Sequence, residues 1–215
     1  MLNIAEKFLS EAERREVESR VAAAEKRTSG EIVVMIAPSS YHYPYAGLLG
    51  GSLLSMVLAI AVSMLLSKES MWFFLCAFVL LFILMHELFK RVLSIKRPFI
   101  SRKDMAAEVE EAAVMAFYRS GINRTSEHTG ILLYLSLFER RVRVVADQGI
   151  NAKVEQSAWQ EIADIITCGF QDNTPCKALS SAVDRCGDIL EAHFPRKTGD
   201  TNELANTLLI GVPGK

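Results

Sequence analysis

The chain has 215 residues, of which 24 are Lys or Arg and 25 are Asp or Glu, so its formal net charge is −1. Half of the residues are hydrophobic, and the mean hydropathy is +0.20. This length and composition fit one domain, or one domain with an appendage, and they exclude a disordered chain, a collagen and a small disulfide scaffold. The balanced charge, with no strongly basic domain, argues against nucleic acid as a partner.

The first 45 residues contain a helical pattern followed by a strand. Apolar residues recur at helical spacing along 4–28, with Glu and Arg on the opposite face, and Ser29-Gly30 ends the pattern. Residues 32–36 form a short apolar run rich in β-branched side chains that ends before Pro38, which predicts a buried strand. We therefore assign 1–45 to the first part of an α/β domain.

Two long apolar stretches follow and predict a helical hairpin at 46–89. Residues 46–66 carry no charge, and as a helix they would span about 31 Å, which matches the ~30 Å hydrocarbon core of a bilayer. After a short connector, residues 70–85 are again uncharged, and Glu87 falls near the end of the second stretch. The alternative, a buried hairpin in a soluble core, is disfavoured because a domain this small could not readily cover two such stretches. We predict two transmembrane spans.

Charges beside the hairpin predict its orientation. Six basic residues lie after the second span and before the first acid, Asp104. Lys90, Arg91, Lys96 and Arg97 belong to a basic juxtamembrane segment at 90–100, and Arg102 and Lys103 follow it. Because cytoplasmic flanks of membrane spans carry the excess of Lys and Arg, both termini and the α/β domain should be cytoplasmic. We therefore expect a protein of the plasma (inner) membrane, with the lipid bilayer as its first partner.

Small residues recur at every fourth position of the first span. They are Gly47, Gly51, Ser55, Ala59 and Ser63. A stripe of this kind lets another helix backbone approach closely. That helix is either the second span of the same hairpin or the first span of another copy, which would give a homo-oligomer.

The second part of the α/β domain is predicted at 101–195. A helix through 105–117 leads to an apolar strand at 131–135, and an alternating run at 141–146 follows as its antiparallel partner. Helices are then expected from Asn151 to Gly169 and from Thr174-Pro175 to just before Pro195. The tail at 196–215 is polar, with a short strand at 206–212.

The order of these elements sets the fold class as α/β. A strand, a long connection, a helix and a second strand form a parallel crossover, and the predicted membrane hairpin is inserted into it. Ligand sites of open α/β sheets favour the carboxyl ends of the parallel strands. The first strand ends at the segment 38–45, so this segment marks the expected site edge.

Residues 129–150, TGILLYLSLFERRVRVVADQGI, resemble the strand, ER turn and V-x-V-x-x-D-x-G-I hairpin of the TPM-domain family. Residues 29–34 and Trp159 are also similar to that family, and residues 200–206 are similar to the tail of its bacterial membrane-anchored branch. The resemblance extends over most of 10–206 apart from the spans. It implies an α/β/α sandwich of the TPM type, here with a two-helix transmembrane hairpin inserted after the first strand.

The resemblance also implies candidate chemistry. Some relatives are described as acid phosphatases or bind calcium, and thylakoid-lumen relatives are linked to photosystem repair. Many relatives carry Asp-Asn-Gly ahead of the second strand, where this chain reads Glu127-His128-Thr129, so an inherited calcium site is in question.

Four carboxylates are weak candidates for a Ca²⁺ or Mg²⁺ site, namely Glu31, Glu127, Glu139 and Asp147. The pattern does not force them together, because Glu139 and Asp147 lie at opposite ends of one strand. His128 could act as an acid or base, but no nucleophile is visible near it, so the catalytic residues are unknown. Glu139-Arg140-Arg141 is expected to be a solvated turn, with a binding surface as the alternative.

Two functions follow from these features. The first is a non-enzymatic, membrane-anchored interaction or assembly module that has a protein partner at the cytoplasmic face of the membrane. The second is a divalent-metal-dependent phosphatase of the TPM family, which only the resemblance suggests.

Overall fold

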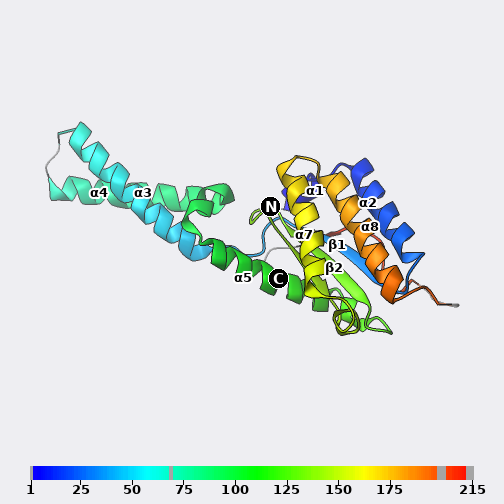
Figure 1. The fold of residues 1–215 in the computed structure, drawn as a ribbon. Helices are drawn as coiled ribbons and strands as arrows, with labels where there is room; N and C mark the ends of the chain where they lie inside the picture. The colour runs from blue at the N-terminus through cyan, green and yellow to red at the C-terminus, as the bar shows by residue number, and fades with distance from the viewer. Residues whose placement is uncertain (1, 68–69, 198–201, 212–215) are drawn as a thin grey trace. The chain divides into compact units, whose positions relative to one another are not determined.

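The computed structural model describes residues 2–67, 70–197 and 202–211 (Figure 1). The chain divides into two compact units, one formed by Met1–Tyr41 and Ala106–Lys215 and the other by His42–Met105. The first unit is therefore built from two separate stretches of sequence. The predicted connector of the hairpin falls partly on 68–69, which lie outside the described residues.

A four-stranded sheet forms the centre of the first unit, with strand order β3-β2-β1-β4. The strands are β1 (Glu31–Ala37), β2 (Gly130–Ser136), β3 (Arg141–Ala146) and β4 (Leu209–Ile210). β1 pairs in parallel with β2 and with β4, and β2 pairs with β3 as an antiparallel hairpin. The predicted parallel crossover and hairpin are confirmed. The predicted terminal strand is shorter than 206–212, and Val212 lies outside the described residues.

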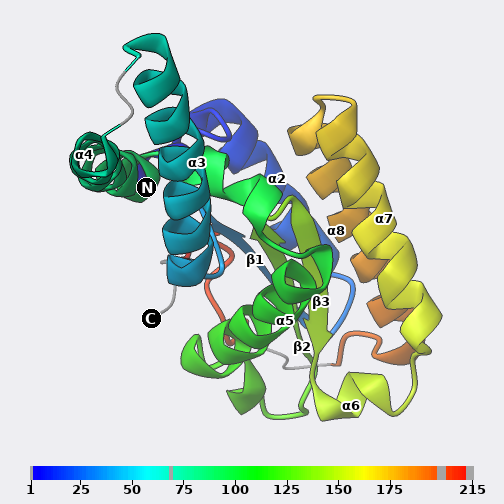
Figure 2. The same ribbon diagram turned by 90° about the vertical axis from the view of Figure 1, so that its left-hand side faces the viewer.

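Helices cover both faces of this sheet (Figure 2). They are α1 (Leu2–Glu6), α2 (Glu11–Glu25), α5 (Arg102–Arg119), α6 (Gln148–Asn151), α7 (Gln156–Gln171) and α8 (Pro175–His193), with a 3-10 turn η2 (Ile122–Arg124). Because side chains alternate along a strand, β1 contributes to two cores. Ile32, Val34 and Ile36 pack with α2, α7 and α8, whereas Val33 and Met35 pack with α5. The result is a mixed α/β fold.

Two helix boundaries differ from the sequence prediction because polar side chains cap the backbone. The helix expected over 4–28 is divided, since Ser10 accepts a hydrogen bond from the Glu13 N–H and the Glu13 carboxylate accepts one from the Ser10 N–H. The helix expected from Asn151 is also divided. Asp147 caps the short helix α6, and α7 begins only at Gln156.

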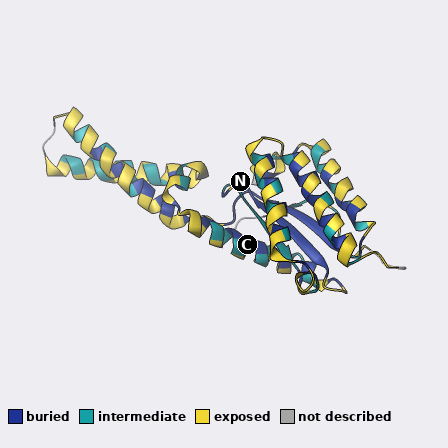
Figure 3. Cartoon of the chain, viewed as in Figure 1, coloured by how far each residue is buried: buried dark blue, intermediate teal, exposed yellow. Residues whose placement is uncertain are grey.

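The second unit contains α3 (Pro44–Leu65), α4 (Met71–Arg91) and the 3-10 helix η1 (Leu93–Phe99). Both α3 and α4 are long and apolar enough to cross a membrane. Most of their large apolar side chains are exposed, among them Leu65 at 84% and Trp72 at 71% (Figure 3).

The small residues of α3 lie mostly on its covered face. Gly47, Gly51, Ser55 and Ala59 are buried, and Ser63 is half-buried. A side chain at Gly47 would contact Phe89 of α4 and Lys96 of η1, and one at Gly51 would approach the His86 backbone. These contacts place Gly47 and Gly51 against α4 and η1 of the same hairpin, and packing against another copy stays a prediction.

Candidate functional site

A buried cluster of polar side chains joins the carboxyl ends of β1 and β2. Ser39 and Ser40 follow β1, Ser136 ends β2, and Glu139 lies in the turn between β2 and β3. The Ser40 backbone N–H lies 3.1 and 3.3 Å from the two Glu139 carboxylate oxygens. Ser136 donates its hydroxyl hydrogen to the same carboxylate. Parallel strands have their carboxyl ends side by side, so the segment after β1 and the end of β2 both form hydrogen bonds with the Glu139 carboxylate.

The cluster continues through two further hydroxyl groups. Ser40 Oγ lies 3.0 Å from Ser136 Oγ and 3.3 Å from the Tyr134 hydroxyl. Tyr134 is only 4% exposed, and burial is the largest cause of the increase in its pKa above the ordinary value of 10.0. A continuous series of hydrogen bonds therefore runs from Tyr134 through Ser40 and Ser136 to Glu139.

A groove of about 550 Å³ opens beside this cluster. Ser40 and Tyr134 line it from the sheet, and α5 contributes its charged residues Glu108, Glu111 and Arg119. Its apolar wall includes Met35, Ala112, Met115, Ala116 and Ile210. The volume is within the range of small-molecule sites, and the position agrees with the expectation that the segment after the first strand marks a site edge.

The turn that follows β2 differs from its prediction at one residue. Glu139 is 2% exposed, so it is not part of a solvated turn and cannot belong to a binding surface. The reason is that its carboxylate is satisfied by buried donors. Arg140 is exposed, with a left-handed φ of 52°, and Arg141 is half-buried. A binding surface at Arg140 and Arg141 stays a prediction.

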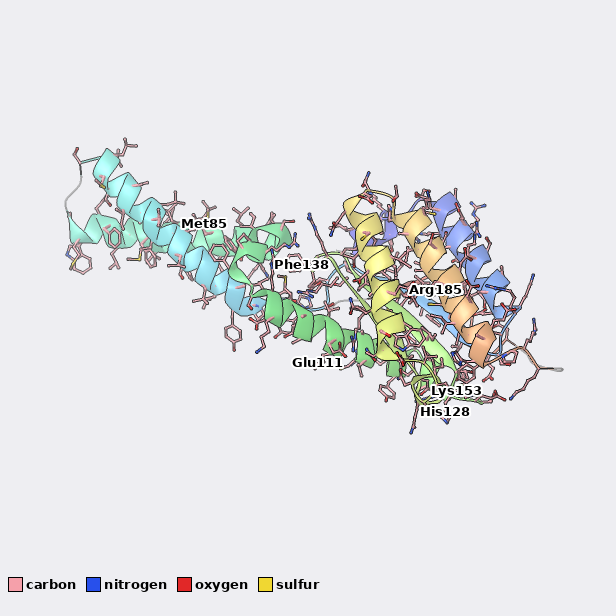
Figure 4. The ribbon with its side chains drawn as sticks, viewed as in Figure 1. Met85, Glu111, His128, Phe138, Lys153 and Arg185 are labelled. Carbon is pink, nitrogen blue, oxygen red and sulfur yellow. The ribbon has the colours of Figure 1, made fainter. Side chains whose placement is uncertain are left out.

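The other three candidate metal ligands lie at the opposite end of the sheet, as the labels of Phe138 and His128 in Figure 4 indicate. Each has a protein partner there. Asp147 caps α6 and lies 3.3 Å from His128 Nδ1, and Glu127 pairs with Lys197. The Glu31 carboxylate accepts a hydrogen bond of 2.9 Å from the Glu203 N–H.

This arrangement does not fit the calcium site that the resemblance implied. Within residues 2–67, 70–197 and 202–211, no three His, Cys, Asp or Glu side chains converge on a position that could hold a metal ion. Glu139 is separated from the others by the length of the strands, and Glu127 is engaged by a lysine. Three of the four carboxylates accept hydrogen bonds from backbone N–H groups, and the fourth, Glu127, forms an ion pair with Lys197.

A second buried acid lies near Glu31. Glu25, at the end of α2, accepts a 2.9 Å hydrogen bond from the Ile32 N–H, and it lines a small cavity of about 220 Å³ with Glu31 and Asn206. Burial raises the pKa of Glu25 to about 8, and the neighbouring charge of Glu31 adds to the increase. This increase favours the protonated form of Glu25 in the folded protein at neutral pH.

Comparison with known proteins gives one family match and one similar fold. Residues 97–189 match the family described as TPM domain. This stretch of the chain is therefore similar to a TPM domain. Its fold is similar to the NMR structure of the BA42 protein from the psychrophilic bacterium Bizionia argentinensis, with a TM-score of 0.60 and 21% sequence identity. The similarity covers 96% of this chain and 97% of BA42, and at this identity it shows the fold alone. No curated protein matches the chain.

Sequence reasoning missed most of the polar cluster at the carboxyl ends of β1 and β2. Ser39, Ser40, Tyr134 and Ser136 were not singled out, although the edge on which they lie was predicted. The available signal was a pair of serines directly after the first buried strand and a serine at the end of the parallel strand beside it. Glu25 was missed because its helical position looked like part of the solvated face.

Proposed function

We propose that this protein is an integral membrane protein whose TPM domain acts as a non-enzymatic interaction or assembly module at the cytoplasmic face of the membrane. The observation that carries the anchor is the exposure of apolar side chains on both α3 and α4. Only 22% and 6% of their most apolar windows are buried. A helix that is apolar and uncovered requires an apolar environment, which a bilayer supplies.

The charge distribution supports the cytoplasmic orientation. Lys90 and Arg91 lie in the last turn of α4, and Lys96 and Arg97 follow in η1. The connector between the helices carries a single Lys in the sequence. Such an asymmetry favours the cytoplasmic side for the basic end of the hairpin. The TPM domain, which continues from both ends of the hairpin, would then lie in the cytoplasm.

Membrane fractionation tests the anchor, and native cysteines test the side. We expect the full chain to stay in the pellet after alkaline carbonate extraction. Cys168 is exposed on α7, whereas Cys176 and Cys186 are buried and Cys76 lies in a span. A membrane-impermeant maleimide should therefore label Cys168 in inverted membrane vesicles and spare it in intact cells, with Cys168→Ser as the control. Extraction by carbonate, or labelling in intact cells, would contradict the proposal.

The partner surface is tested at the β2–β3 turn. Arg140→Asn keeps a residue that tolerates the left-handed backbone, and together with Arg141→Gln it removes two positive charges. Cross-linking and pull-down from solubilised membranes should lose partners with this variant. A control of equal charge change, Arg15→Gln on α2 with Lys26→Gln directly after this helix, should keep them. Unchanged partners with the first variant would remove this surface from consideration.

The phosphatase alternative has a direct test on the same purified chain. Hydrolysis of p-nitrophenyl phosphate that depends on Ca²⁺ or Mg²⁺ would contradict a non-enzymatic role. We expect no metal-dependent turnover, and no increase in melting temperature when either ion is added. Because the four predicted ligands are engaged elsewhere, a metal that stabilises the fold would have to use other oxygen ligands.

A further inference from the structure

The hydroxyl groups beside the groove have hydrogen atoms whose directions can be deduced. The Glu139 carboxylate accepts a hydrogen bond from the Ser136 hydroxyl, and this bond uses the single hydroxyl hydrogen of Ser136. The Ser136 oxygen then accepts from Ser40 over 3.0 Å. Ser40 has used its hydrogen, so its oxygen accepts from the Tyr134 hydroxyl over 3.3 Å. Every hydroxyl hydrogen in the series points toward Glu139.

This direction decides what the groove offers to a bound molecule. Ser40 and Tyr134 both line the groove. Since their hydrogen atoms point away toward Glu139, they present oxygen lone pairs, which accept hydrogen bonds. The Tyr134 phenol is protonated at neutral pH because its ordinary pKa is 10.0 and burial raises it further, so the direction is maintained. The polar part of the groove therefore selects hydrogen-bond donors.

The charge of the α5 wall favours the same kind of ligand. Glu108 and Glu111 line the groove, and Glu111 is exposed on α5, where Figure 4 labels it. Arg119 lies eleven residues after Glu108, which corresponds to about 16 Å along the helix axis, so the acidic and basic ends of this wall are separate. Between them, Met115 and the alanines of α5 provide apolar surface.

We propose that this groove is a binding site for a small organic cation with N–H donors, namely a primary ammonium or guanidinium group on an aliphatic chain. The cationic group donates to the oxygens of Ser40 and Tyr134 and lies near the carboxylates of Glu108 and Glu111. The aliphatic chain covers Met35 and Met115. This site is independent of membrane insertion, so its failure leaves the proposed anchor untouched.

A pair of matched probes tests the inference on the full chain in detergent. Pentylammonium and pentyltrimethylammonium have the same charge and the same chain, but only the first has N–H donors. Calorimetric titration should show saturable binding of pentylammonium in the millimolar range, and of agmatine more tightly, because agmatine carries both a guanidinium and an ammonium group. Pentyltrimethylammonium should bind at least about tenfold more weakly, since it leaves the lone pairs of Ser40 and Tyr134 without donors.

Variants assign the binding to this groove. Tyr134→Phe removes one acceptor and Glu111→Gln removes one charge, and each should weaken pentylammonium binding about tenfold. Glu111 is on the surface, so its replacement leaves the fold intact even if Tyr134→Phe lowers the melting temperature. The control is Glu110→Gln on the same helix, because Glu110 pairs with Arg143 and does not line the groove.

Three outcomes would overturn the proposal. The first is equal affinity for the two matched probes, which would mean that hydrogen-bond donation does not matter. The second is binding of pentanoate in preference to pentylammonium, which would mean that Arg119 determines the ligand. The third is the absence of saturable binding by any of the probes, or binding that Glu111→Gln does not change.

Discussion

Glu25 makes the stability of the α/β unit depend on pH. Its carboxylate is largely buried, and burial raises its pKa from the ordinary value of 4.5 to about 8. Between these two pH values, the folded protein holds a proton on Glu25 that the unfolded chain releases. The stability that this proton contributes is fully present below pH 4.5 and is lost as the pH rises through 8.

The size of this effect follows from the difference between the two pKa values. One pKa unit corresponds to about 1.36 kcal/mol, so an increase from 4.5 to about 8 sets an upper bound of about 5 kcal/mol on the change in unfolding free energy. Glu25 keeps partial contact with solvent, which screens its charge. We therefore expect wild type to lose on the order of 3 kcal/mol between about pH 5 and pH 9.

The assay compares wild type with Glu25→Gln, whose amide oxygen can still accept the hydrogen bond from Ile32. Urea unfolding of the full chain in detergent is followed by the fluorescence of Trp159, which is 3% exposed in the core. Trp72→Phe in the background removes the other tryptophan. The variant should lose much less stability than wild type over this pH range. Glu11→Gln, an exposed acid on the same helix, should keep the slope of wild type.

Two results would refute this reasoning. A wild-type unfolding free energy that stays level or increases from pH 5 to pH 9 would mean that Glu25 is ionised in the folded state. A Glu25→Gln variant that keeps the full decrease of wild type would mean that another group causes it.

Three further predictions concern packing and the buried cluster. Glu139→Ala leaves the Ser40 N–H and the Ser136 hydroxyl without their acceptor, and should lower the unfolding free energy by about 3 kcal/mol in the urea assay. Gly50→Ala would place a methyl group 2.7 Å from a Phe89 ring carbon and should lower the unfolding free energy by about 1–3 kcal/mol. The methyl group of the control variant Gly51→Ala meets nothing closer than 3.9 Å, so thermal unfolding in detergent should give the two variants different melting temperatures. Equal melting temperatures would contradict the hairpin packing. Gly169→Ala would collide with the Ala178 side chain where α7 meets α8, so a variant as stable as wild type in urea would contradict that close approach.

Elements with strong periodicity were predictable from the sequence. Three patterns were clear in the sequence: the apolar run at 32–36, the alternation at 141–146 and the two uncharged stretches. Each pattern fits only one kind of secondary structure, so these strands and helices were assigned correctly. Helix boundaries were less predictable. The break before α2 depends on Ser10 and Glu13 exchanging hydrogen bonds, a local device that competes with a continuing apolar stripe.

The candidate site was predictable as a place and not as a set of residues. Parallel pairing fixes which strand ends meet, so the edge after β1 could be expected from topology alone. Whether a given acid is exposed depends on distant donors. Glu139 looks like a surface residue beside two arginines, and only the register of β1 against β2 brings the Ser40 N–H onto its carboxylate.

The central position of β1 constrains the order of events during synthesis. Both of its neighbours in the sheet, β2 and β4, are translated after it, and β2 is separated from it by the whole of the second unit. A nascent chain from which Ile32–Ile36 have just emerged holds an unpaired, strongly apolar strand until β2 has also left the ribosome. Chaperone occupancy of the growing chain should therefore begin with this strand and end when the β1–β2 ladder closes, which ribosome profiling of chaperone-bound nascent chains would resolve.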